Sequence, residues 1–345
     1  MTQSVQLQHP EKILLIRFSA IGDLILISHL IRLIHQQYPN ARLDLVVKQG
    51  YESIYQAHPA LRKIWLFQKG ELRLLKNKLK QENYSLILDL QGNLKSRMLS
   101  IALRGVPVFR THMYRFRRFL LVRFGLNVYS EIAPVPLRHL KAASCLRLED
   151  DGKGLDLFLP EEKVPQRQWE TLAEANFIAV APGASRATKR WPVDSFHEVA
   201  DYFLNKGFGV VLLGGSEDRE LCQRIIEKQN HSNRIENLAG SLTLMQTASV
   251  LQKAGLLISN DTGLMHVASA CQIPQIAIFG PTVEAFGFFP FRAHASILEI
   301  KDLSCRPCSF HGTESCPKGH FKCMKDISAS DVICEAERLL IKDRA

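Results

Sequence analysis

The chain has 345 residues, of which 46% are hydrophobic and 23% charged, and its formal net charge is +10. This composition excludes a largely disordered chain, and the length suits two domains better than one. No run of about 18 apolar residues occurs, so the sequence predicts no transmembrane helix. The polar start does not resemble a signal peptide, and we expect a cytoplasmic protein.

Strands and helices alternate in the first half of the chain. We predict helices at 25–37 and 71–81, and strands at 13–18, 42–47, 64–67 and 85–90. Strands separated by helices indicate a parallel sheet with helices on both faces. A first domain at 1–165 follows from this pattern.

The character of the sequence changes at 159–176, which holds two prolines and several charges and is interpreted as a linker. The alternation then restarts, with helices at 195–206 and 264–270 and strands at 177–180, 210–213, 256–259 and 276–279. We therefore predict an α/β protein with two doubly wound domains, 1–165 and 166–345. Ligands of open α/β sheets bind at the carboxyl ends of the strands, and two such edges facing each other would form a cleft.

Positive charge is concentrated in one segment of the first domain. Between residues 90 and 130 there is no Asp or Glu, and the basic residues there are Lys95, Arg97, Arg104, Arg110, Arg115, Arg117, Arg118 and Arg123. Such a segment predicts an anionic partner: nucleic acid, an anionic membrane surface or a phosphorylated substrate. A solvated surface run is the alternative. The segment lacks the signatures of nucleic-acid-binding modules, which makes nucleic acid the least favoured partner.

The first strand ends in Phe18-Ser-Ala-Ile-Gly-Asp23. Gly22 indicates a close approach of the backbone to another group. A carboxylate at the carboxyl edge of the sheet can take a proton from a hydroxyl, so Asp23 is a candidate general base. The alternative is that Asp23 only complements the helix dipole.

Three turns in the second domain also follow strands. The first, APGASRATKRWP at 181–192, supplies the hydroxyls of Ser185 and Thr188 and the cation of Lys189, which suit a phosphate. The second, LLGGSED at 212–218, places Glu217 where an acid can accept hydrogen bonds from ribose. It is neither a P-loop nor a G-x-G-x-x-G motif. Plain loops between strands and helices are the alternative for both.

The third turn, NDTGLMHVASA at 260–270, is the most specific of the three. Asp261 and Thr262 can cap a helix, and the backbone amides of Thr262, Gly263 and Leu264 would then point at an anion. His266 lies in the first turns of that helix, where the alternative is a buried core histidine.

No Asp-x-Asp motif occurs, so a catalytic divalent cation held by paired carboxylates is not indicated. Backbone amides, Lys189 and nearby hydroxyls would have to neutralise a diphosphate leaving group.

Four of the eight cysteines are close together, with the spacing C-x2-C-x7-C-x6-C: Cys305, Cys308, Cys316 and Cys323. Three interpretations stay open, namely a structural zinc site, a reduced cluster and a disulfide pair.

The motifs RFSAIGDLILISHLI, APGASRATKRWP, LLGGSED and NDTGLMHVASA, in this order, resemble the ADP-heptose:lipopolysaccharide heptosyltransferases of glycosyltransferase family 9. The resemblance covers about residues 12–330, and the cysteine-rich segment is similar to that of the heptosyltransferase II type. It implies a GT-B fold, in which two Rossmann-like domains face each other across a cleft. It also implies a final helix at about 328–343 that packs toward the first domain.

The resemblance implies inverting, metal-independent transfer of heptose from ADP-L-glycero-D-manno-heptose to the inner core of lipopolysaccharide. Asp23 would be the general base and Lys189 would stabilise the departing diphosphate. Further donor-binding residues would be Ser185, Thr188, Glu217, Asp261, Thr262, Gly263, Leu264 and His266. Arg115, Arg117 and Arg118 would bind the phosphorylated acceptor, at the anionic inner face of the inner membrane. The alternatives are a GT-B transferase or epimerase that acts on another nucleotide sugar, a relative without catalytic activity that binds nucleotide sugar as a sensor, and a basic nucleic-acid-binding protein.

Overall fold

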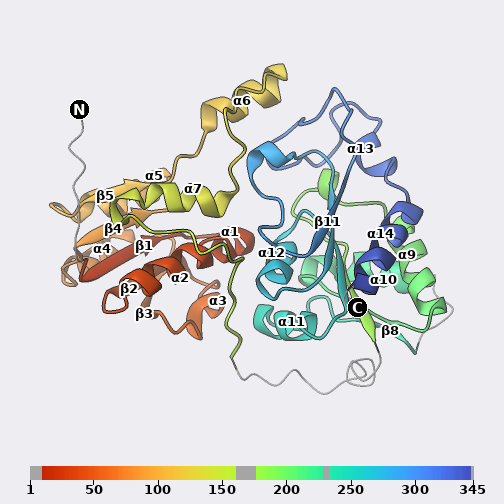
Figure 1. The fold of residues 1–345 in the computed structure, drawn as a ribbon, viewed down its shortest axis with the longest axis horizontal. Helices are drawn as coiled ribbons and strands as arrows, with labels where there is room; N and C mark the ends of the chain where they lie inside the picture. The colour runs from red at the N-terminus through yellow and green to blue at the C-terminus, as the bar shows by residue number, and fades with distance from the viewer. Residues whose placement is uncertain (1–9, 161–175, 228–232, 343–345) are drawn as a thin grey trace. The chain divides into compact units, whose positions relative to one another are not determined.

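The computed structural model describes residues 10–160, 176–227 and 233–342, and internal contacts divide them into two compact units (Figure 1). Unit 1 holds residues 10–114 and 133–160, and unit 2 holds residues 115–132 together with the described residues beyond 160. The predicted boundary between 165 and 166 lies outside the described residues. None of the described helices is long and apolar enough to cross a bilayer.

Unit 1 is built on a parallel five-stranded sheet with the order β3-β2-β1-β4-β5. Its strands are β1 (Lys12–Ile16), β2 (Arg42–Lys48), β3 (Leu61–Phe67), β4 (Leu86–Asp89) and β5 (Val108–Arg110). Its helices are α1 (Ile21–Ile25), α2 (Ser28–Gln37), α3 (Ser53–Gln56), α4 (Leu72–Lys80), α5 (Leu94–Ala102) and α7 (Val135–Ala142), followed by the 3-10 turn η1 (Ser144–Leu146).

The predicted strands of unit 1 are confirmed, and three of the four apolar runs form buried strands, whereas β3 is only partly buried. Residues 13–16 of β1 are fully buried, as expected for a central strand covered on both faces. The helix predicted at 25–37 differs from the structure: it begins earlier, as α1, and is interrupted after Ile25 before α2 begins at Ser28. The short edge strand β5 and the helix α5 were not predicted.

Unit 2 is built on a parallel six-stranded sheet with the order β11-β10-β9-β6-β7-β8. Its strands are β6 (Phe177–Ala181), β7 (Gly209–Leu212), β8 (Ile235–Asn237), β9 (Leu256–Asn260), β10 (Gln275–Phe279) and β11 (Ala295–Glu299). Its α-helices are α6 (Arg115–Phe124), α9 (Val193–Asn205), α10 (Arg219–Ile226), α11 (Leu244–Leu251), α12 (Gly263–Ala270), α13 (Lys322–Lys325) and α14 (Ala329–Lys342). Short 3-10 turns are η2 (Ala187–Lys189), η3 (Ser216–Asp218) and η4 (Glu284–Phe286).

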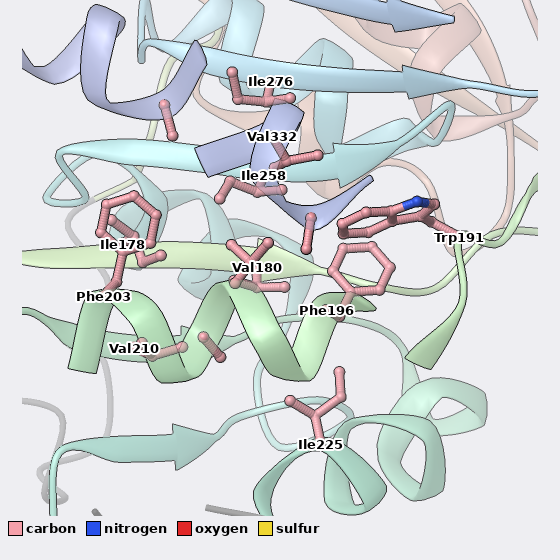
Figure 2. Close-up of a cluster of buried hydrophobic side chains, with 14 of the residues drawn as sticks. Ile178, Val180, Trp191, Phe196, Phe203, Val210, Ile225, Ile258, Ile276 and Val332 are labelled. Carbon is pink, nitrogen blue, oxygen red and sulfur yellow. The ribbon is translucent and has the colours of Figure 1, made fainter. Parts of the chain in front are cut away.

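The main core of unit 2 lies between the sheet and the helices α9, α10 and α14. Figure 2 shows side chains of β6, such as Val180, beside Phe196 and Phe203 of α9, with Val332 of α14 in the same cluster. The two doubly wound sheets confirm the predicted fold class. The final helix buries its apolar face in unit 2 itself, against α9 and the strands β9 to β11, and the packing toward the first domain that the resemblance implies stays a prediction.

Helix α6 also departs from the sequence-based expectation, because it packs with unit 2 although it precedes the end of unit 1 in the chain. Leu121 is buried beside Ala285 and Phe286 of η4. The guanidinium carbon of Arg118 lies 3.9 Å from the ring centroid of Phe310. These apolar and cation–π contacts explain why a segment placed within 1–165 belongs by its contacts to the other unit.

Asn260, the last residue of β9, joins two segments at the carboxyl edge of the second sheet. Its side chain is fully buried, and its Nδ2 donates to the carbonyl of Pro182 at 2.8 Å. Its Oδ1 accepts from the backbone N–H of Trp191 at 3.0 Å. One buried amide therefore fixes both ends of the loop that carries Lys189.

We expect Asn260→Ala to lower the free energy of unfolding by about 2–4 kcal/mol, because it leaves buried backbone groups of Pro182 and Trp191 unpaired. Urea denaturation measures the effect. Asn205→Ala is the matched control, since the Asn205 side chain is exposed at the end of α9. Equal stability of the two variants would contradict this role for Asn260.

Candidate functional site

The chemistry-bearing turns of unit 2 follow four strands that are neighbours in the sheet, β10, β9, β6 and β7. Because these strands are parallel, their carboxyl ends lie at one edge, and the turns after them meet there. The turns hold the predicted residues Lys189, Glu217 and Asp261. Unit 1 contains a cavity of about 680 Å³ around Lys12 and Arg42. It lies where the strands of that sheet begin, whereas the turns described above follow the ends of strands in unit 2, so the cavity is not part of this arrangement.

Lys189 and Asp261 form a largely buried ion pair. The Nζ of Lys189 lies 2.6 Å from Oδ2 of Asp261, and only 12% and 10% of their side chains are exposed. The hydroxyl of Thr282, in the turn after β10, donates to the same carboxylate oxygen at 2.8 Å. A buried carboxylate needs such partners, since an isolated charge there would be strongly disfavoured. An ammonium has three N–H donors, so Lys189 keeps donor capacity beyond Asp261.

Helix α12 begins directly after this pair. Thr262 occupies the N-cap position, but its side chain makes no capping hydrogen bond to the helix. The partial positive charge of the helix N-terminus therefore lies next to Asp261 and Lys189, in a setting that suits an anion. His266 is buried in the same helix, as in the core-histidine interpretation.

Thr188 has a partner that the sequence did not indicate. Its hydroxyl donates to the carbonyl of Thr313 at 2.9 Å and accepts from the backbone N–H of Thr313 at 2.7 Å. Next to Thr313, a Cβ added at Gly312 would lie 2.9 Å from Cγ of Lys189, and Arg186 pairs with Glu314. The cysteine-rich segment thus fastens the loop that carries Lys189, and the hydroxyl proton of Thr188 is already donated within the protein.

Arg306 was missed by the sequence analysis and holds the neighbouring turn. Its guanidinium donates to the carbonyls of Gly280 at 2.5 Å and Thr282 at 2.8 Å, and pairs with Glu299 at 2.8 Å. These contacts position the turn whose Thr282 hydroxyl binds Asp261. The sequence around Arg306 does not indicate that it holds this turn, because the backbone carbonyls that it binds belong to a distant segment and can be supplied by any residue type.

The glycine turn after β7 contains two acids with different environments. Glu217 is exposed, whereas the carboxylate of Asp218 accepts from the N–H of Gly215 at 3.0 Å and packs against Gly183 and Gly214. Burial raises the pKa of Asp218, and the nearby Glu217 charge adds to the effect. Gly183 and Gly214 leave room for this carboxylate, since a Cβ at either position would collide with it. Asp218 therefore shapes the turn, and Glu217 is the acid that a ligand can reach.

Asp23 in unit 1 is held by Arg17, a residue that the sequence analysis did not single out. The Nη2 of Arg17 lies 2.6 Å from Oδ1 of Asp23. The same guanidinium donates to the carbonyls of Ser19 at 3.1 Å and Leu90 at 2.7 Å, which fixes it at the ends of β1 and β4. Asp23 is thus a partly exposed carboxylate at the carboxyl edge of its sheet, oriented by a buried cation.

The three arginines predicted to bind the acceptor lie in α6. Arg118 stacks on Phe310, and Arg117 donates to the hydroxyl of Ser130 at 3.4 Å. Arg115 is exposed. Their contacts place this basic group with unit 2.

The four clustered cysteines lie in one segment of unit 2, where Sγ of Cys305 is 3.8 Å from Nε2 of His320. All eight cysteines are free thiols, as in the reduced-cluster interpretation. In the described part of the chain, three potential ligand atoms lie within 4.8 Å of one another only at His29, Asp150 and Asp151. The structural zinc site predicted at the four cysteines is not confirmed and stays a prediction. Burial raises the pKa of Cys323 to about 11, which favours the neutral thiol.

The triad His29, Asp150 and Asp151 is an ion-pair network. Asp151 is already bound by Arg32 at 2.8 Å, and Nε2 of His29 lies 3.1 Å from Asp150. These contacts attach the segment at 150–156 to helix α2.

The two doubly wound parallel sheets have the GT-B fold, which the chain shares with solved glycosyltransferase structures. Residues 72–318 match glycosyltransferase family 9 (heptosyltransferase), and the chain belongs to this family. The matched stretch includes Lys189, Glu217 and Asp261, and it begins after Asp23.

Relatives of known name agree with the family. The chain is 29% identical to lipopolysaccharide heptosyltransferase 1 of Pseudomonas aeruginosa, over 86% of each chain. It is 25% identical to lipopolysaccharide heptosyltransferase 2 of Escherichia coli, covering 97% of this chain and all of that protein. The solved structure of E. coli ADP-heptose lps heptosyltransferase II has a TM-score of 0.73 and 24% identity, covering 97% of this chain and all of that one.

We expect Thr188→Val to lower the free energy of unfolding by about 1–3 kcal/mol, because both hydrogen bonds to Thr313 are lost. Thr188→Ser keeps the hydroxyl and should retain most of the stability. Urea denaturation of both variants compares them. A valine variant as stable as the serine variant would show that the hydroxyl does not fasten the cysteine-rich segment.

Proposed function

We propose that this glycosyltransferase transfers heptose from an ADP-heptose donor to the inner core of lipopolysaccharide. The observation that carries the proposal is the buried Lys189–Asp261 pair at the N-terminus of α12, inside the stretch that matches family 9. The names of the relatives, which specify lipopolysaccharide and ADP-heptose, supply the two substrates.

In this proposal the carboxyl edge of unit 2 binds the donor. Lys189 and the amides of Thr262, Gly263 and Leu264 neutralise the diphosphate as the bond to the sugar breaks. Asp261 orients Lys189, and its carboxylate holds the ammonium in place before the donor arrives. Glu217 accepts hydrogen bonds from the ribose, and Ser185, which is exposed on the same loop as Lys189, contacts a phosphate. Thr188 and His266 support this edge from within the protein.

The acceptor hydroxyl is activated by Asp23. Its carboxylate takes the proton while the hydroxyl attacks the anomeric carbon from the face opposite the diphosphate, so the anomeric configuration is inverted. Arg17 holds the carboxylate in place before the reaction. No step uses a metal ion, because Lys189 and backbone amides supply the positive charge at the leaving group.

Arg115, Arg117 and Arg118 bind the acidic groups of the acceptor in this proposal. Arg118 is oriented by its stack on Phe310, and Arg115 is exposed at the start of the same helix, where its guanidinium can contact a phosphate. Such an acceptor is carried in a membrane, so the enzyme works at the inner face of the inner membrane.

Asp23→Asn should abolish acceptor-dependent release of ADP, with a loss of about 10²–10⁴-fold, because asparagine cannot accept the proton. Donor binding should survive, since the asparagine side chain retains an oxygen for Arg17. The measurement is ADP release from ADP-heptose with and without a heptose-deficient lipopolysaccharide acceptor. Asp302→Asn is the control, because Asp302 is an exposed aspartate of unit 2.

The same assay separates the parts of the proposal. Wild-type protein that binds donor but releases no ADP with this acceptor would refute the acceptor, and absence of donor binding would refute the sugar nucleotide. Activity that a chelator removes and a divalent cation restores would refute the metal-independent step. Proton NMR of the product reports whether the anomeric configuration is inverted.

Glu217→Gln should weaken donor binding, while Asp218→Asn should leave it near the wild-type value. Isothermal titration with ADP measures both. The native pKa of Asp218 is raised by burial, so its stabilising contribution is present below the unfolded pKa of about 4 and is lost as pH rises through the native pKa. Asp218→Asn should therefore reduce the dependence of the free energy of unfolding on pH in this range. Loss of ADP binding in Asp218→Asn alone would reverse the roles of the two acids.

A further inference from the structure

Three apolar side chains of helix α5 lie on its exposed face, although a helix that packs on a sheet normally turns such side chains toward the sheet. Leu94, Met98 and Ile101 are 74%, 44% and 67% exposed. They are spaced i, i+4 and i+7, which places them on one face of the helix. An ordinary surface helix turns this stripe toward the core, so this face has no structural explanation within unit 1.

The buried side of α5 is unusually polar. Leu99 enters the core beside α4, but Ser96 and Ser100 are buried on the same side. The hydroxyl of Ser96 donates to the buried Asp89 at 3.0 Å, and Ser100 accepts from Arg110 at 2.7 Å. These hydrogen bonds fix the rotation of α5 on the sheet. The helix therefore cannot turn its apolar stripe inward without breaking them.

Cations border the exposed stripe. Lys95, Arg97 and Arg104 are exposed at its sides, and no acidic residue occurs between residues 90 and 130. A stripe of three aliphatic side chains with a basic border is complementary to a surface that is apolar below and anionic above.

We propose that this face of α5 docks on an anionic lipid bilayer. Leu94, Met98 and Ile101 enter the boundary between headgroups and acyl chains, and Lys95, Arg97 and Arg104 contact lipid phosphates. The proposal rests on the proposed function for its setting, because the acceptor of that reaction is carried in a membrane. The exposed face of α5 is then the surface through which this chain contacts the membrane that carries the acceptor.

Other occupants fit the face less well. A second copy of the chain, bound through the same face, would bring its own Lys95, Arg97 and Arg104 against these cations, and the segment 90–130 has no acid to balance them. A nucleic acid would match the basic border but not the three aliphatic side chains at its centre.

The experiment is co-sedimentation of the full chain, without substrates, with vesicles. One set contains phosphatidylethanolamine and phosphatidylglycerol, and the other contains phosphatidylcholine alone. The wild type should bind the anionic set and be released by salt, because lipid phosphates are screened at high ionic strength. The variant Leu94→Gln/Met98→Gln/Ile101→Gln should bind about tenfold less or weaker still, through loss of its apolar insertion.

Two further variants make the comparison specific. Lys95→Gln/Arg97→Gln/Arg104→Gln should lose the preference for anionic vesicles. Leu74→Gln/Ile341→Gln is the matched control, because it removes exposed apolar side chains of α4 and α14 and should bind as the wild type does. Circular dichroism should show that every variant is folded, since the altered side chains are exposed.

The proposal is overturned if the wild type ignores anionic vesicles, or if the α5 triple variant and the control lose binding equally. It is also overturned if the α5 substitutions change the oligomeric mass while vesicle binding stays the same, which would assign the face to a second copy. Transfer to a delipidated, soluble acceptor should persist in the α5 variants. Absence of transfer in all proteins with vesicle binding intact would refute the proposed function and leave the docking surface standing.

Discussion

The carboxylate of Asp261 lies at the end of a central strand, and much of unit 2 is arranged to keep that charge paired. Lys189 and Thr282 bind it directly. Asn260 fixes the loop that carries Lys189, and Arg306 fixes the turn that carries Thr282. A buried charge tolerates few arrangements of its neighbours, so these bonds restrict how the loops at this edge can move. The loops at this edge of the sheet are therefore held together by one connected set of polar contacts.

Unit 1 also holds a carboxylate in an ion pair, but in that pair the buried member is the cation. Arg17 is tied to two carbonyls at the ends of neighbouring strands, and Asp23 is the partly exposed partner. A base must reach its substrate, whereas an anion clamp must exclude competing water. The exposed carboxylate in one unit and the enclosed ammonium in the other agree with that division of roles in the proposed reaction.

The sequence predicted those features that local pattern determines. Continuous apolar runs gave the central strands β1, β6 and β9, because a strand covered on both faces is apolar over most of its length. The edge strands β5 and β8, with three residues each, carry too little pattern to be recognised. Motif spacing placed Lys189 and Asp261 in the candidate site. The contact between Thr188 and Thr313 joins residues 125 positions apart, and that of Arg306 depends on backbone carbonyls, so neither leaves a trace in the local sequence.

Helix α5 was not predicted from the sequence, and the reason for this also explains why its apolar residues are exposed. Its apolar positions have helical spacing, yet the helix was not predicted, because basic residues interrupt them and its core side contains serines. Asp89 accounts for the serines: a buried carboxylate at the end of β4 needs donors, and Ser96 with the amides of Gln91 and Gly92 provides them. Because the core side of the helix makes these polar contacts, Leu94, Met98 and Ile101 on the opposite face remain exposed. Their presence there is best explained by contact with an apolar environment outside the protein.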